Sequence, residues 1–205
     1  MSAKDRASLI VDTNIQAYFR DVVTEAVSHQ KLNASDETVY YLVNLLTTFT
    51  RSDQLYEQTP DGIMIRPLAT MYADAVQAPS LEDRNQALKR LGDVALFIAG
   101  VFADSLNRKV VDVDYYIAMG GNAYGCLSDS VRGAFRWRGF SGVFSELADR
   151  FTDFVDVLDE VCERAPMRSA DDTVRLYELW QRTGSERVAR RLQRLGVQPL
   201  TVIRH

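Results

Sequence analysis

Arginine and aromatic residues gather in one glycine-punctuated stretch of the chain, residues 132–142. Arg, Trp and Phe are enriched at protein–protein interfaces, because they combine large contact area with charge or hydrogen bonding. Such a segment could also bind an anion or stack on a nucleic-acid base. The alternative is a connection whose rings enter the core while its arginines pair with nearby acids. The candidate partner-binding residues here are Arg132, Phe135, Arg136, Trp137, Arg138 and Phe140.

A second basic feature lies near the C-terminal end of the sequence. Residues 166–205 hold eight arginines against four acidic residues, although the whole chain has a net charge of −4. A helix expected over 185–195 has arginines on one side and apolar residues on another. Most such helices simply dock by their apolar stripe, but the basic face could also meet an acidic partner or a membrane surface. The candidate partner-binding residues of this helix are Arg187, Arg190, Arg191 and Arg194.

Small residues recur at spacings of three and four in two successive predicted helices. Side chains set the distance between packed helices. These ridges therefore predict an antiparallel hairpin whose backbones approach closely. The ridges are Gly92, Ala95, Ala99 and Ala103, followed by Ala118, Gly121 and Gly125.

The glycine run within residues 120–125 also admits a ligand-binding interpretation. Each glycine inside a helix costs about 1 kcal/mol relative to alanine, and room for a flat ligand would explain that cost. A histidine at the end of the first predicted helix could then ligate a haem. In these two features the chain resembles helical haem-degrading enzymes. This alternative assigns ligand binding to His29, Gly120, Gly121, Tyr124 and Gly125.

Motifs for most enzyme chemistry are missing from the sequence. With only two histidines, His29 and His205, neither an HExxH motif nor a histidine-rich metal site can form. There is no Gly-x-Ser-x-Gly elbow and no phosphate-binding glycine loop. Cys126 and Cys162 form no CxxC pair and are expected to be buried free thiols. We therefore expect no metal, no cofactor and no catalytic residue, and favour a non-enzymatic function.

Two aspartates, Asp93 and Asp104, share one face of a predicted helix. About 16 Å of helix axis separates them, which is too far for one metal ion or a catalytic carboxylate pair. Arg90 and Arg108 each lie within one turn of an aspartate. Intrahelical ion pairs are therefore expected.

These candidate residues must be positioned by helices. Residues 94–103 are apolar on every side, yet a bilayer span requires about 20 such residues. The run therefore predicts a buried central helix over 81–108. Ser35 and Ser80 are expected N-caps, and only 197–203 looks extended. Further helices are expected over 8–30, from 35 to about 51–54, 64–78, 112–128, 141–164, 170–183 and 185–195.

These patterns predict an all-α fold: one domain over 1–205, with about seven or eight helices around the helix 81–108. A pI near 5.3 argues against nucleic-acid binding. No segment has the length of a membrane span or the apolar core of a signal peptide, so a cytoplasmic location is expected. The predicted function is that of an adaptor or regulatory protein that binds another protein, either one with an acidic surface or a second copy. The alternative is a helical protein or enzyme that binds a planar hydrophobic ligand.

Overall fold

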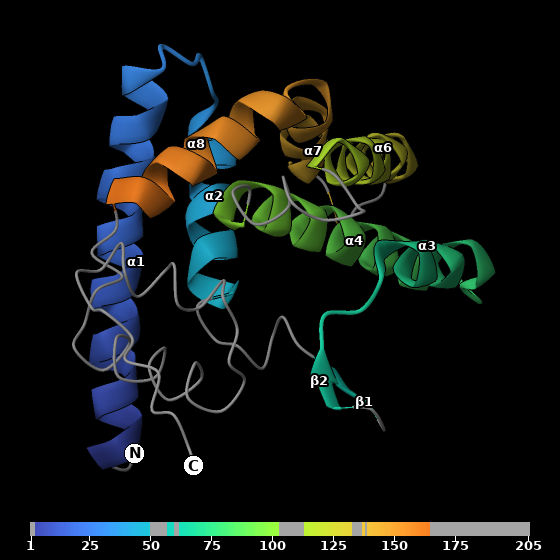
Figure 1. The fold of residues 1–205 in the computed structure, drawn as a ribbon, viewed down its shortest axis with the longest axis horizontal. Helices are drawn as coiled ribbons and strands as arrows, with labels where there is room; N and C mark the ends of the chain where they lie inside the picture. Colours follow the sequence, from blue (N-terminus) through green and yellow to red (C-terminus); the bar gives the residue numbers. More distant parts are fainter. Residues whose placement is uncertain are drawn as a thin grey trace, which may run out of the picture. The chain divides into compact units, whose positions relative to one another are not determined.

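The computed structural model describes residues 3–49, 57–59, 62–102, 113–132, 137 and 139–164. Seven helices and one short hairpin form this part of the chain (Figure 1). The all-α prediction is confirmed for these residues. Several predictions concern residues outside these ranges. They are the helices expected over 170–183 and 185–195, the extended segment 197–203, and a single domain over 1–205. The helices are α1 (Ala3–His29), α2 (Asp36–Phe49), α3 (Leu68–Gln77), α4 (Leu81–Val101), α6 (Val113–Val131), α7 (Phe140–Asp149) and α8 (Phe151–Arg164).

Helix α4 is buried at the centre of the described bundle, as its apolar run predicted. All of residues 91–100 are buried, and α4 packs against α2, α3 and α6. Ser80 caps its first turn, where the Ser80 Oγ accepts a 3.1 Å hydrogen bond from the Asp83 amide. The helix is shorter than predicted, because it ends at Val101 and Phe102 leaves helical geometry. Apolar spacing carries no stop signal there, which is why the prediction continued to 108.

Helices α1 and α2 form an antiparallel pair (Figure 1). Apolar residues recur along α2 at the spacing of an amphipathic helix, so that one broad face is buried. Besides α1, helix α2 packs against α4 and α7. Its buried residues are Thr38, Tyr41, Leu42, Val43, Leu45, Leu46 and Phe49.

A small hairpin precedes α3, and only its last residue lies where the sequence predicted helix. Strands β1 (Glu57–Thr59) and β2 (Gly62–Met64) pair antiparallel. Met64, expected in the helix, therefore lies in β2, and α3 begins at Leu68. Pro67 precedes that first residue. Its fixed φ angle suits a helix start, which is a stronger boundary signal than an apolar residue at helical spacing.

The single helix predicted over 141–164 is in fact two helices, α7 and α8. Arg150 separates them with φ −126° and ψ 32°. Buried residues continue at helical spacing on both sides of the break, so the pattern shows one uninterrupted stripe. At the break, Phe151 packs against Gly120 of α6. That contact comes from a distant part of the sequence, and no local pattern reports it.

Glu146 of α7 binds the first turn of α2. Its carboxylate accepts hydrogen bonds from the Ser35 amide (3.2 Å), the Ser35 hydroxyl (2.7 Å) and the Thr38 hydroxyl (2.7 Å). Ser35 is also the predicted N-cap, since its Oγ accepts from the Thr38 amide. Burial raises the pKa of Glu146, but these hydrogen bonds and the nearby Arg150 charge outweigh burial and lower the pKa below its usual value.

Glu146→Gln is expected to remove a pH-dependent part of the stability. A carboxyl group whose pKa is lowered by folding stabilises the fold above its unfolded pKa, and this contribution is lost as the pH falls through the folded pKa. At about pH 7, wild type should exceed Glu146→Gln in free energy of unfolding by about 1 kcal/mol, because the carboxylate keeps some contact with water. This difference in free energy of unfolding should become smaller as the pH falls below 4.5, the usual pKa of a glutamate side chain.

Urea unfolding followed by circular dichroism, at about pH 7 and about pH 3.5, measures this difference. A wild-type advantage of the same size at both pH values would contradict the assignment to Glu146 ionisation.

Candidate functional site

A buried carboxylate, Asp93, lies in the middle of α4 and joins three helices. The residue is only 8% exposed. Its Oδ1 accepts hydrogen bonds from the Tyr41 hydroxyl of α2 and, at 2.7 Å, from the Tyr124 hydroxyl of α6. The Lys89 Nζ lies 2.6 Å from its Oδ2. Three donors therefore meet one carboxylate within the bundle.

Residues of α4 close to Asp93 in the sequence help to bring these groups together. Lys89 precedes Asp93 by four residues, so both side chains lie on one face of the helix. Tyr124 reaches the carboxylate past Gly92, where a Cβ would lie only 2.7 Å from Tyr124 Cε1. Tyr41 lies on α2, and its ring is edge-on to the Tyr124 ring, with 6.4 Å between the ring centres. The glycine at position 92 is thus a requirement of the site.

Both tyrosines are held in the protonated form. Burial raises the pKa of Tyr41 and of Tyr124 well above the usual value, and the Asp93 charge raises both further. They therefore act as hydrogen-bond donors at physiological pH. Lys89 balances the Asp93 charge, and its Nζ also lies 5.2 Å from the centre of the Tyr41 ring. The network thus holds one cation in a defined orientation.

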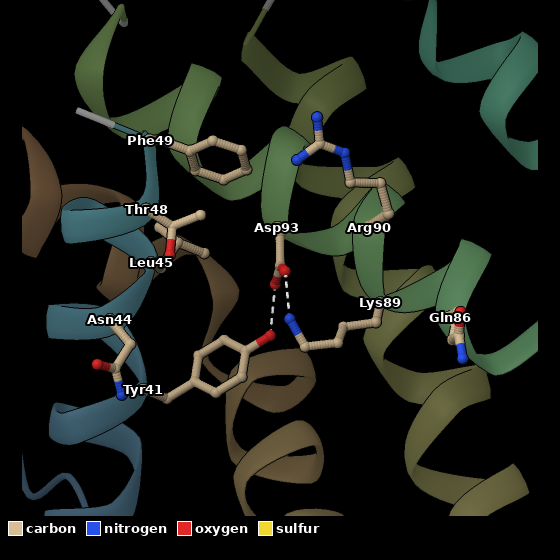
Figure 2. A pocket seen from close by; sticks show the side chains of 9 residues that line it. All are labelled: Tyr41, Asn44, Leu45, Thr48, Phe49, Gln86, Lys89, Arg90 and Asp93. Atoms are coloured by element: carbon tan, nitrogen blue, oxygen red, sulfur yellow. Dashed lines mark hydrogen bonds and ion pairs between the residues drawn. The ribbon is translucent and has the colours of Figure 1, made fainter. Parts of the chain in front are cut away.

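A pocket of about 270 Å³ opens beside this network, between α2 and α4 (Figure 2). Asp93 forms part of its wall, and Leu45 and Phe49 add apolar surface. Figure 2 shows Lys89 and Arg90 on either side of the Asp93 carboxylate. The Arg90 guanidinium lies 5.1 Å from the centre of the Phe49 ring. Polar side chains complete the lining: Asn44, Thr48 and Gln86, together with the Tyr41 hydroxyl.

Three of the candidate partner-binding residues fall within the described part of the chain. Phe140 is 47% exposed and stacks on the buried Phe144 with 6.1 Å between ring centres. Trp137 is partly buried against Phe144, and its Nε1 donates a 3.2 Å hydrogen bond to Glu82 at the start of α4. Arg132 is exposed, 3.5 Å from an aspartate one turn earlier. Phe135, Arg136, Arg138, Arg187, Arg190, Arg191 and Arg194 lie outside the described residues.

The residues of the alternative ligand site lie in two separate places. A Cβ on Gly120 would lie 2.3 Å from Phe151 Cζ, so a protein side chain occupies the space beside this glycine. Tyr124 is fully buried in the Asp93 network. His29, at the end of α1, has its Nδ1 3.1 Å from Glu160 of α8. Glu160 and Phe151 are nine residues, or ~13 Å of helix axis, apart on α8.

Two local predictions are corrected by the structure. Cys126 is exposed rather than buried, because it does not lie on the buried face of α6. Cys162 is only partly buried. Asp93 makes its intrahelical ion pair with Lys89, while Arg90 lies over an aromatic ring. The remaining members of the predicted charge pattern, Asp104 and Arg108, lie outside the described residues.

Sequence alone did not reveal Tyr41, Lys89 and Asp93 as a site. One signal was available, since Asp93 is a charged residue inside the buried run 91–100. A buried carboxylate needs several donors to offset its loss of hydration. Two of those donors come from 52 and 31 residues away, and no local spacing identifies them.

Comparisons with protein-family models, with curated proteins and with solved structures gave no match. Within the described ranges, no helix is long and apolar enough to cross a membrane. In that same part of the chain, no three His, Cys, Asp or Glu side chains gather as a metal site. Function must therefore be inferred from the geometry of the chain itself.

Proposed function

We propose that this protein is an adaptor or regulatory protein that acts by binding another protein. The binding surface, here named the α4–α7 surface, consists of Leu81, Arg132, Trp137 and Phe140. The main support is the exposure of two large apolar side chains at this place, since Phe140 is 47% and Leu81 is 58% exposed. Covering the exposed half of each would contribute about 1 kcal/mol to binding.

Contacts beneath the α4–α7 surface hold it in shape. Trp137 donates a hydrogen bond to Glu82, and Ser130 donates a 2.6 Å hydrogen bond to Asn85. These bonds connect the end of α6, and the residues just before α7, to the first turns of α4. Trp137 and Phe140 also pack on the same buried phenylalanine. Aromatic residues that are already in place lose little conformational entropy when a partner binds.

The expected partner has an acidic surface. The Arg132 side chain is 67% exposed, and residues 166–205 contain eight arginines. Opposite charges steer association and favour a partner of complementary charge. A second copy of this chain is the other partner considered, and a cytoplasmic location is part of the proposal. Ligand binding beside 120–125 has less support, because Phe151 takes the space beside Gly120.

Phe140→Asp is expected to remove the partner from the purified protein. The carboxylate would be buried without a donor in the interface, which opposes binding. The measurement is quantitative mass spectrometry of proteins that co-purify with the tagged chain from its own host. The partner should fall by at least about tenfold, a change of roughly 1.4 kcal/mol.

Tyr40→Asp is the matched control, because Tyr40 is an equally exposed aromatic residue, at 54%, on α2. The partner should be retained in that variant. An identical set of co-purified proteins in wild type, Phe140→Asp and Tyr40→Asp would remove the α4–α7 surface as the binding site. Sedimentation analysis completes the test: a wild-type dimer that becomes a monomer only in Phe140→Asp identifies the partner as a second copy.

A further inference from the structure

Helix α3 is apolar on a second side besides the one that is buried. It packs beside α4 (Figure 1), and its buried residues are Leu68, Met71 and Ala75. A further set of apolar residues recurs at helical spacing on the neighbouring side of the helix, where water reaches it. Within this set Tyr72 is 49% and Val76 is 65% exposed. The set, here named the α3 stripe, consists of Ala69, Tyr72, Ala73 and Val76.

The apolar part of α3 is wider than its buried side accounts for. At about 100° per residue, the three buried residues cover about 60° of the helix circumference, and the α3 stripe covers about 100° next to them. A stripe of about 100° is the width that an amphipathic helix normally buries against a neighbour. Large apolar side chains that gather at one exposed place mark an interaction site. The α3 stripe is therefore suited to contact with a further helix.

No charged residue lies on the α3 stripe. Asp74 is the one charged residue in the sequence of α3. It lies about 150° around the helix from the centre of the stripe, and its carboxylate is 2.6 Å from Arg66. In a contact with two-fold symmetry, each surface meets its own copy, so a charge on it would face a like charge. The uncharged α3 stripe avoids this repulsion, which favours a second copy of this chain as its partner.

Small and large residues alternate along the α3 stripe in an order that is complementary to itself. Two α3 helices can lie antiparallel, with a two-fold axis between positions 72 and 73. Tyr72 of each copy then faces Ala73 of the other copy, and Val76 of each faces Ala69 of the other. Every large side chain thus meets an alanine, so the two helices can approach closely without a clash.

We propose that two copies of this chain form a dimer through the α3 stripe, with their α3 helices antiparallel. The helix has ten residues, or about 15 Å of axis. The contact area is therefore small, and the dimer should dissociate reversibly as the protein is diluted. None of the residues of the α3 stripe belongs to the α4–α7 surface, so either contact can fail without the other.

Sedimentation equilibrium of the full chain at increasing concentration measures the dimer. Val76→Asp should raise the dimer dissociation constant by at least about tenfold, because the contact would bury a carboxylate from each copy without a donor. Thr70→Asp is the matched control, since it adds the same charge at an exposed position on the polar side of the same helix. The dissociation constant should stay at the wild-type value in Thr70→Asp and in Phe140→Asp. Far-ultraviolet circular dichroism of each variant should match wild type.

Three results would overturn the dimer through α3. The first is a wild-type chain that stays monomeric at every concentration; a different protein that then co-purifies with Thr70→Asp but not with Val76→Asp would be the true partner of the stripe. The second is equal weakening in Val76→Asp and Thr70→Asp, which would indicate only the effect of added charge. The third is a dimer that is lost in Phe140→Asp and kept in Val76→Asp, which would assign dimerisation to the α4–α7 surface.

Cysteine cross-linking tests the antiparallel register. Ala69→Cys and Val76→Cys are each made together with Cys126→Ser, because Cys126 is exposed. Positions 69 and 76 of opposite copies face each other in the proposed dimer, whereas the two copies of position 69 are offset by about 10 Å along the axis, too far for a disulfide. Oxidation of a mixture of the two variants should therefore give a disulfide-linked dimer, and oxidation of either variant alone should not. No linked dimer in the mixture, or an equal yield from one variant alone, would overturn this register.

Discussion

Replacing Asp93 with alanine should lower the free energy of unfolding by about 3–5 kcal/mol, the usual effect of removing one partner from a buried charge pair. The substitution removes the common acceptor of the Tyr41 and Tyr124 hydroxyls and the partner of Lys89. Both tyrosines are buried, and a buried donor left without an acceptor costs about 1–3 kcal/mol. Urea unfolding followed by far-ultraviolet circular dichroism measures the change.

Asp129→Ala is the matched control for this prediction. Asp129 is an exposed aspartate paired with Arg132 at 3.5 Å, and loss of such a pair changes stability by about 0.5 kcal/mol or less. Tyr124→Phe, which removes one donor and keeps the ring, should cost about 1 kcal/mol. If Asp93→Ala does not fold, Asp93→Asn retains an acceptor and should give a smaller loss. Equal stabilities of Asp93→Ala and Asp129→Ala would show that the buried network does not stabilise the fold.

Gly120→Ala and Gly121→Ala should change stability in opposite directions, although the two glycines are neighbours on α6. A Cβ on Gly120 would lie 2.3 Å from Phe151 Cζ and 2.8 Å from the Ala95 Cβ. Neither neighbour is free to move, because both are buried. Overpacking of this kind costs about 1–3 kcal/mol. Around Gly121 the nearest atom is 3.8 Å away, so alanine fits and should add up to about 1 kcal/mol through helix propensity.

Thermal unfolding and urea unfolding of each variant, compared with wild type, show whether its free energy of unfolding rises or falls. The pair is its own control, since the helix, the substitution and the change in propensity are the same. A stabilised Gly120→Ala would mean that α8 is not seated against α6 at this point, and would favour a ligand beside 120–125 instead.

Local chemistry predicted the start of a helix well where a serine cap marks it. Ser35 and Ser80 cap α2 and α4 as expected, because a serine hydroxyl bonds the open amides of the turn that follows it. Where the boundary depended on distant contacts, prediction was wrong. The apolar stripe shows no break at Arg150, and nothing marks the end of α4 at Val101.

The sequence by itself determined that α4 is a buried central helix, because an apolar run shorter than a membrane span is stable in water only when other helices cover it. It also determined that Lys89 and Asp93 share a face of that helix, since four residues make about one turn. Only the tertiary structure decided that Tyr41 and Tyr124 share the Asp93 carboxylate and that a pocket opens beside it. The physical reason is that three helices must pack before those groups meet, and helical periodicity describes each helix separately.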